Sequence, residues 1–195
     1  IQFHGAYDPR VKGMPIADIR VREALAIAVN QDEISKTLFY GKALPLMPPR
    51  VLYGQDDIDS DYWVQFCKQF YAYDPTKAKK LLADAGYQNG FSFKLYVTPQ
   101  AGMDYVDKLA IIVQSYWKAI GVPIDVKLLE SALSTERRNK GDYDIFFQGG
   151  GNHVLEPAYQ AVRYYHSANI PPGNNNSSYT RADAILERLV TSFDP

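Results

Sequence analysis

Cysteine is almost absent from this chain of 195 residues: Cys67 is the only one, so no disulfide can form within it. Histidine is equally scarce, and His4, His153 and His166 are too scattered for the ligand spacing of a zinc site. The longest uninterrupted apolar run covers the six residues 24–29, whereas a membrane-spanning helix needs about 20. No charged start followed by an apolar core is present, so we expect no signal peptide within this stretch.

An excess of either charge is also missing. Lys and Arg total 21 against 22 Asp and Glu, which leaves a formal net charge of −1. This balance gives no global attraction for nucleic acid or anionic membranes, and the only local basic candidate is the short stretch 136–140. Apolar residues make up 46% and charged residues 22%, which is typical of a globular chain with a real core. At this length we expect one large domain or two small ones.

Helical and strand-like patterns alternate through the middle of the chain. Asp74 followed by Pro75 is a typical helix start, and Gly86 is a typical helix end. Residues 103–120 repeat apolar side chains every three or four positions and predict a second helix. Strands are expected at 91–97, 123–129 and 143–148, with a short helix at 134–140. Strands separated by helices at this spacing need crossover connections, so the sequence predicts an α/β fold with a mostly parallel sheet.

The flanking segments are less regular. Residues 1–6 alternate weakly and predict a strand, and Asn30 with Glu33 resembles a capping box at a helix start. Helices are expected at 18–29, 31–38, 156–165 and 181–193. The first is expected to carry one stripe of Ile19, Arg22, Ala26 and Val29, with Leu25 beside it, and the last to turn Ala184, Ile185, Arg188 and Leu189 inward or to the flank. Residues 42–62, rich in Pro and Asp, indicate an ordered non-helical excursion, and a loop this long is usually functional.

Three consecutive glycines, Gly149, Gly150 and Gly151, follow the last of the expected strands. Open α/β sheets bind ligands beyond such strand ends, and glycine lets a ligand approach the backbone closely. A phosphate-binding loop would need Gly-Lys-Ser or Gly-Lys-Thr before a helix, whereas Asn152 and His153 come next. We therefore expect a ligand contact here, with a flexible turn as the alternative.

His153 also suggests a catalytic alternative, because it could form an acid–base pair with Glu156. No Gly-x-Ser-x-Gly nucleophile elbow accompanies the pair. A solvated or ligand-contacting histidine is therefore the simpler interpretation, and a hydrolase or transferase is the alternative.

Aromatic residues are plentiful, with 15 Tyr, 9 Phe and 2 Trp. Most must lie in the core, but Tyr53, Tyr62, Trp63 and Tyr179 fall in segments expected to be loops. Rings on loops bind sugars, peptides or partner surfaces, and the alternative is packing beneath the long excursion. The acidic cluster at 56–61 lacks the glycine and the terminal Glu of a calcium loop, so a solvated turn is expected there.

Several stretches, taken together, resemble a known family. They follow one another along nearly the whole chain, at residues 18–30, 73–87, 120–126, 140–145 and 176–179, with Asp183 shortly after. In this order they are similar to the landmarks of the family 5 extracellular solute-binding proteins of ABC transporters, the oligopeptide- and dipeptide-binding group. The combination is specific, although each stretch alone would be a weak signal.

This resemblance implies a periplasmic-binding-protein-like (type II) lobe, with a central mixed, mostly parallel sheet flanked by helices. Family members are two-lobed receptors that close on a solute and hand it to a membrane permease. Residues 1–195 are therefore expected to be the C-terminal lobe only, without the N-terminal lobe. The resemblance further implies a non-catalytic component of an ABC importer, periplasmic or extracellular and membrane-anchored, that needs no cofactor. Alone, such a lobe should bind solute weakly or not at all.

The resemblance also bears on the solute. Peptide-binding members carry an Asp that pairs with the ammonium of the peptide, and Asn152 or His153 stands at that position here. A charge-assisted hydrogen bond is about twice as strong as a neutral one, so this change argues against peptides with free N-termini. It favours modified peptides, sugar conjugates, opine-like compounds or metal chelates. Together with the loop aromatics, the expected ligand-binding residues are Gly149, Gly150, Gly151, Asn152, His153, Tyr53, Trp63 and Tyr179.

Two other function classes stay open at this point. One is a small hydrolase or transferase that uses His153 and Glu156. The other is a sensory or partner-binding domain that keeps the fold without a permease.

Overall fold

A mixed sheet organises the part of the chain that the computed structural model describes, namely residues 2–3, 6–43, 59–99, 101–140, 145–148, 157–170, 175 and 177–191. Its strands are β1 (Gln2–Phe3), β2 (Phe93–Thr98), β3 (Ile124–Leu128) and β4 (Ile145–Gln148), in the spatial order β1-β4-β2-β3. β2 pairs in parallel with both β3 and β4, and β1 pairs antiparallel with β4. The expected mostly parallel sheet is thus confirmed.

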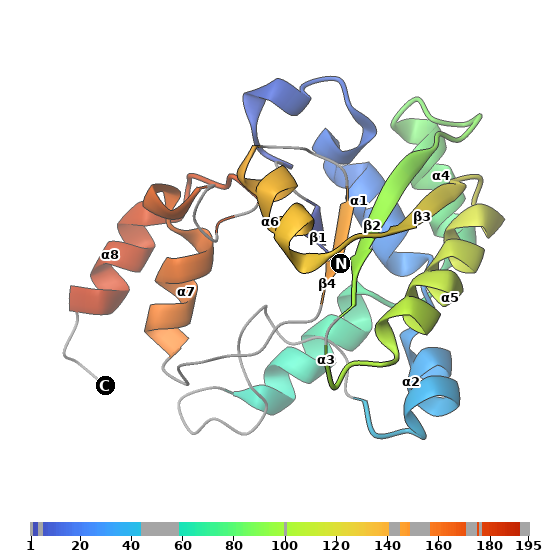
Figure 1. Cartoon of the computed structure of the whole chain (residues 1–195), viewed down its shortest axis with the longest axis horizontal. Helices are drawn as coiled ribbons and strands as arrows, with labels where there is room; N and C mark the ends of the chain where they lie inside the picture. Colours follow the sequence, from blue (N-terminus) through green and yellow to red (C-terminus); the bar gives the residue numbers. More distant parts are fainter. Residues whose placement is uncertain are drawn as a thin grey trace.

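The helices surround this sheet (Figure 1). They are α1 (Ile19–Ile27), α2 (Gln31–Phe39), α3 (Ser60–Phe70), α4 (Pro75–Asp84), α5 (Val106–Ala119), α6 (Ser131–Asn139), α7 (Pro157–Tyr165) and α8 (Asp183–Thr191). Short 3₁₀ turns are η1 (Pro9–Val11), η2 (Pro15–Ala17) and η3 (Ser167–Asn169). Apart from α3, each of these helices lies at or within a few residues of an expected helix.

Helix α3 corrects one expectation from the sequence. Residues 42–62 were expected to be non-helical and Tyr62 and Trp63 to lie on a loop, but a helix begins at Ser60 and contains both rings. The physical reason is an N-cap, because the Asp59 carboxylate accepts a hydrogen bond of 2.8 Å from the backbone N–H of Tyr62. The Asp residues interpreted as a solvated turn therefore include a helix-capping residue.

The main core lies between the sheet and helices α1, α4 and α5. Leu95 and Val97 point from β2 into this core and are fully buried. Trp117 of α5 is 1% exposed, and its indole N–H donates a hydrogen bond of 2.8 Å to the carbonyl of Leu25 in α1. That bond satisfies the one polar group of the largest buried side chain and joins two of the helices that cover the sheet.

The apolar stripes expected for the first and last helices are partly wrong. In α1 the buried side chains are Val21, Ala24, Leu25 and Ile27, whereas Ile19 is 66% exposed. The packing of α1 against α4 decides this, because it turns the face that contains Ala24 and Leu25 toward Ala78 and Leu82. In α8 only Leu186 is buried, and Ile185 is 71% exposed.

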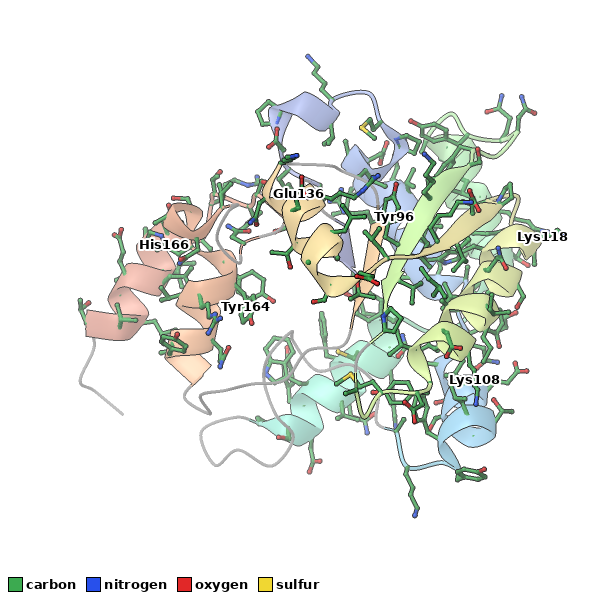
Figure 2. All side chains as sticks on the ribbon, viewed as in Figure 1. Tyr96, Lys108, Lys118, Glu136, Tyr164 and His166 are labelled. Carbon is green, nitrogen blue, oxygen red and sulfur yellow. The ribbon has the colours of Figure 1, made fainter. Side chains whose placement is uncertain are left out.

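The opposite face of the sheet is covered differently. Tyr96 points to this side (Figure 2). The Arg137 guanidinium of α6 lies 4.8 Å from the centre of the Tyr96 ring. Helices α7 and α8 pack against each other beside this layer, at the left of Figure 1. The sheet therefore has one thick apolar side and one side with mixed polar packing.

The amino ends of β2 and β3 meet at a close approach of two glycines. Gly90 and Gly121 both have positive φ, +73° and +88°, and a Cβ on Gly90 would overlap the carbonyl oxygen of Gly121. The turn expected at residues 89–90 is confirmed, and it needs glycine both for its backbone conformation and for this contact.

We predict that Gly90→Ala lowers the free energy of unfolding by about 2 kcal/mol more than Gly102→Ala. Gly102 has nearly the same φ of +78° but open space around its Cβ position, so it reports the backbone strain alone. Urea unfolding of both variants measures the difference. An equal loss of unfolding free energy in the two variants would contradict the close approach of Gly90 and Gly121.

Candidate functional site

The carboxyl ends of three parallel strands meet at one edge of the sheet. The register pairs Thr98 of β2 with Gln148 of β4, and Val97 of β2 with Leu128 of β3. In open α/β sheets ligands bind beyond such ends. The strand β4 ends at Gln148, so the run Gly149–Gly151 follows this edge directly in the sequence. This edge is the candidate site.

Thr98 is the polar residue that the structure adds to this edge. It is 2% exposed, and its Oγ1 has no hydrogen-bond partner among the described residues. A buried hydroxyl without a partner costs about 1–3 kcal/mol, so such groups are rare and commonly have a role. Thr98 is not among the site residues predicted from the sequence; the available signal was a polar residue directly after the apolar run 95–97.

Helix α3 lies on the same side of the molecule as the carboxyl ends. Tyr105, in the connection that leaves β2, packs edge-on against Phe39 of α2 with ring centres 5.0 Å apart. The start of α2 in turn shares a small pocket of about 290 Å³ with the Cys67 side of α3. In the view of Figure 1, α3 accordingly lies below the lower, carboxyl ends of β2 and β4.

Trp63, a predicted ligand-binding residue, belongs to a cluster of rings on α3. Its ring makes T-shaped contacts with Tyr62 and Phe66, with centres 5.2 and 5.6 Å apart. Phe66 stacks on Phe70 at 5.5 Å with 12° between the ring planes. Phe66 and Phe70 are not among the residues predicted from the sequence, although aromatic residues at 62, 66 and 70 have the spacing of one helix face.

Tyr179, another predicted ligand-binding residue, packs elsewhere. Its ring lies edge-on to Tyr7 at 5.0 Å, and the Arg181 guanidinium lies 5.6 Å from its centre. The Tyr7 ring is in turn covered by Arg22 near the start of α1. None of the ring contacts within the described ranges joins Tyr179 to Trp63, and the role of Tyr179 in ligand binding stays a prediction.

The backbone around Tyr179 is held by a buried asparagine. Asn175 is fully buried, and its Nδ2 donates hydrogen bonds to the carbonyls of Tyr165, His166 and Tyr179. A neutral amide whose two N–H groups are shared among three carbonyls ties the end of α7 to Tyr179 without burying a charge. Asn175 directly precedes the stretch 176–179 that resembles the closing motif of the family.

The remaining predicted site residues lie outside the described residues. They are Gly149, Gly150, Gly151, Asn152, His153 and Tyr53, together with Glu156 of the catalytic alternative. Their roles stay predictions.

A second depression lies at the other end of the strands. It has a volume of about 610 Å³ at the amino ends of β2 and β3, and its lining is largely apolar, including Met14, Phe91, Phe93 and Ile124. Size alone would favour this depression as a binding site. We favour the carboxyl edge, because Thr98, which has no partner among the described residues, lies there and the glycine run follows it directly in the sequence.

The titratable groups near α2 and α3 have structural roles. Burial raises the pKa of the Cys67 thiol, which opposes thiolate formation and a nucleophilic role. Burial and a hydrogen bond of 2.7 Å to Glu33 raise the pKa of Tyr116. The capping box is therefore only half formed: Asn30 caps the N–H of Glu33 at 3.0 Å, while the Glu33 carboxylate binds Tyr116 instead.

No three His, Cys, Asp or Glu side chains in the described part of the chain are grouped as metal ligands would be. None of the described helices combines the length and the apolarity needed to cross a membrane.

Comparison with known proteins decides the family. The family of bacterial extracellular solute-binding proteins, family 5 (middle), matches residues 4–172. The chain belongs to this family. Among curated relatives, it is 29% identical over 174 residues to the dipeptide-binding protein of Escherichia coli K12, and 29% identical over 185 residues to heme-binding protein A of Haemophilus influenzae. These matches cover 87% and 90% of the chain and 31% of each relative.

Solved structures of family 5 proteins have the same fold as this chain. The binding protein MoaA of A. tumefaciens R10, solved with mannopinic acid, superposes with a TM-score of 0.73 at 30% identity, over 95% of this chain and 36% of that protein. This confirms the predicted fold class of a type II periplasmic-binding-protein-like lobe. The family and the matched proteins are binding proteins. The chain spans about a third of the length of the proteins it matches.

We predict a pH-dependent contribution from the segment that holds Tyr179. Hydrogen bonds from the side chain and backbone N–H of Ser167 lower the pKa of Asp183 from its ordinary value of 3.8. A lowered folded-state pKa stabilises the fold above 3.8, and the stabilisation is lost as the pH falls through the folded-state pKa. Ser167→Ala should therefore lower the urea unfolding midpoint at pH 7, and the deficit should shrink below pH 3.8.

Ser115→Ala is the matched control, because the Ser115 hydroxyl donates to the carbonyl of Ile112 rather than to a carboxylate. Its effect should not vary over the same pH range. A Ser167→Ala deficit that is the same at both pH values would contradict the role of Asp183.

Proposed function

We propose that this chain forms one lobe of a two-lobed receptor that delivers a solute to an ABC permease, with the solute bound at the carboxyl edge of β2, β3 and β4. The observation that carries this proposal is the parallel register that ends three strands together, just before the glycine run, in a chain that matches the family over residues 4–172. Residues 1–195 would supply one wall of the cleft, as the C-terminal lobe. The N-terminal lobe of the same polypeptide would supply the other.

Such a receptor works by differential affinity. A solute that contacts both walls stabilises the closed pair of lobes relative to the open pair, and a permease that recognises only the closed pair then responds to the solute. One wall alone gives only part of the contacts, so the 195 residues should bind the solute weakly. The receptor would act outside the cytoplasm, in keeping with the extracellular binding proteins of its family.

The solute class follows from the residues after β4. The family resemblance implies that Asn152 or His153 takes the place of the Asp with which peptide-binding members pair an ammonium. A solute without a free N-terminal ammonium fits this chain better than an ordinary peptide. MoaA, whose solved complex holds mannopinic acid, indicates that such non-peptide solutes occur among the matched proteins.

We predict that N-acetyl-Met-Leu binds this chain at least as tightly as Met-Leu. Acetylation removes only the ammonium, and a receptor with a pairing carboxylate would lose about tenfold in affinity or more from that change. Ligand-observed NMR titrations measure both dissociation constants, including weak ones. Tighter binding of Met-Leu would contradict the proposed solute class. Turnover of either compound that His153→Ala abolishes would favour the hydrolase alternative over the receptor.

We also predict that Thr98→Val weakens the binding of N-acetyl-Met-Leu about twofold to tenfold, which corresponds to the loss of one hydrogen bond. The stability of the unliganded chain should not fall, because the hydroxyl that is removed has no partner among the described residues. Thr98→Ser keeps the hydroxyl and should preserve binding. Unchanged affinity in Thr98→Val would exclude this hydroxyl from the site.

A further inference from the structure

Helix α3 presents a row of aromatic side chains to solvent. Tyr62, Phe66 and Phe70, here named the ring stripe, are 56%, 40% and 50% exposed. They follow one another at intervals of four residues, and both successive pairs are stacked, with 24° and 12° between the ring planes. Three large rings with a common orientation on one helix face are unusual at a protein surface and call for a binding partner.

Helix α3 packs against the rest of the protein through a side that does not include the ring stripe. Cys67 is its one buried residue, at 6% exposure, and it faces the pocket shared with the start of α2. The ring stripe lies on another part of the helix surface. The helix is therefore anchored through its Cys67 side, and the exposed parts of the three rings can contact a partner.

The exposed area of the ring stripe indicates what kind of partner it can bind. Fully buried aromatic side chains cover 150–250 Å² each, so three half-exposed rings offer roughly 300 Å². A stable protein–protein interface needs about 800 Å² from each partner. The stripe is too small for such an interface by itself, but it matches the face of a small guest molecule.

The side-chain chemistry of the ring stripe further limits the class of small molecule that it can bind. None of its three side chains carries a charge, and Phe66 and Phe70 offer no hydrogen bond, so the hydroxyls of a sugar would find no partner on these two rings. Aromatic rings instead favour offset-stacked or edge-to-face contacts with other rings. The neighbouring Trp63 ring, T-shaped to Phe66, extends the same apolar surface.

We propose that the ring stripe of α3 is a stacking platform for a planar aromatic group of the bound solute, such as an aromatic side chain of a blocked peptide. This inference rests on the proposed function, since helix α3, which carries the stripe, lies on the side of the molecule where β2 and β4 end (Figure 1). The carboxyl edge would hold the polar part of the solute, and α3 would select its ring.

The test compares two probes of the same shape. N-acetyl-phenylalaninamide carries an aromatic ring, and N-acetyl-cyclohexylalaninamide carries a saturated one. We expect the aromatic probe to bind the 195-residue chain about threefold to tenfold more tightly in NMR titrations. It should also shift the indole N–H resonance of Trp63, while that of Trp117, which is buried and bonded to Leu25, stays in place.

Phe66→Leu keeps an apolar side chain of similar size on the helix but removes the central ring. It should abolish the preference for the aromatic probe and the shift of Trp63, with circular dichroism confirming an intact fold. Tyr40→Leu is the matched control, because Tyr40 is 87% exposed and lies outside the stripe. Equal binding of the two probes, or the same loss in Tyr40→Leu, would overturn the proposal.

Two outcomes separate this inference from its alternatives. If N-acetyl-Met-Leu binds but the ring probes do not discriminate, the stripe proposal fails and the proposed function stands. If the ring probe binds at Trp63 but N-acetyl-Met-Leu does not bind, the blocked-peptide assignment of the solute fails and the platform stands. Sedimentation that shows a dimer which Phe66→Leu dissociates would assign the stripe to a second copy and overturn the solute platform.

Discussion

The parallel pairing of β2 with β3 on one side and β4 on the other is the constraint on which the rest of the structure depends. Because side chains alternate along a strand, this pairing sends Leu95 and Val97 into the core and leaves Tyr96 and Thr98 on the opposite face. A slip of one residue would exchange the two sets and bury polar atoms in the main core. The same register ends the three strands together, which creates the edge assigned to the solute.

The two ends of the strands differ in a way that suits a receptor lobe. At the amino ends, the backbone approach of Gly90 and Gly121 ties two turns together beside an apolar depression. At the carboxyl ends lie a buried hydroxyl without a described partner and, on the same side, a helix with exposed rings. The proposed site thus lies beyond the carboxyl ends of the strands, where ligands commonly bind in α/β folds.

The solute site proposed here combines two kinds of recognition. Polar groups at strand ends discriminate strongly, because a buried donor or acceptor that finds no partner is costly. Exposed rings on α3 tolerate many apolar groups and contribute less selectivity for each contact. With polar recognition at the strand ends and apolar recognition on α3, changes of a few residues would adapt the same lobe fold to different solutes. The names of the matched proteins include varied ligands.

Local sequence signals determined much of this protein by themselves. Caps such as Asp74 and Asn30, glycine helix ends and the three-to-four spacing of α5 depend only on neighbouring residues, so they predicted elements and fold class. Tertiary packing alone decided which face of α1 is buried, that the Glu33 carboxylate binds Tyr116 rather than its own helix, and that Thr98 has no described partner. These outcomes depend on residues distant in the chain, and no local pattern contains that information.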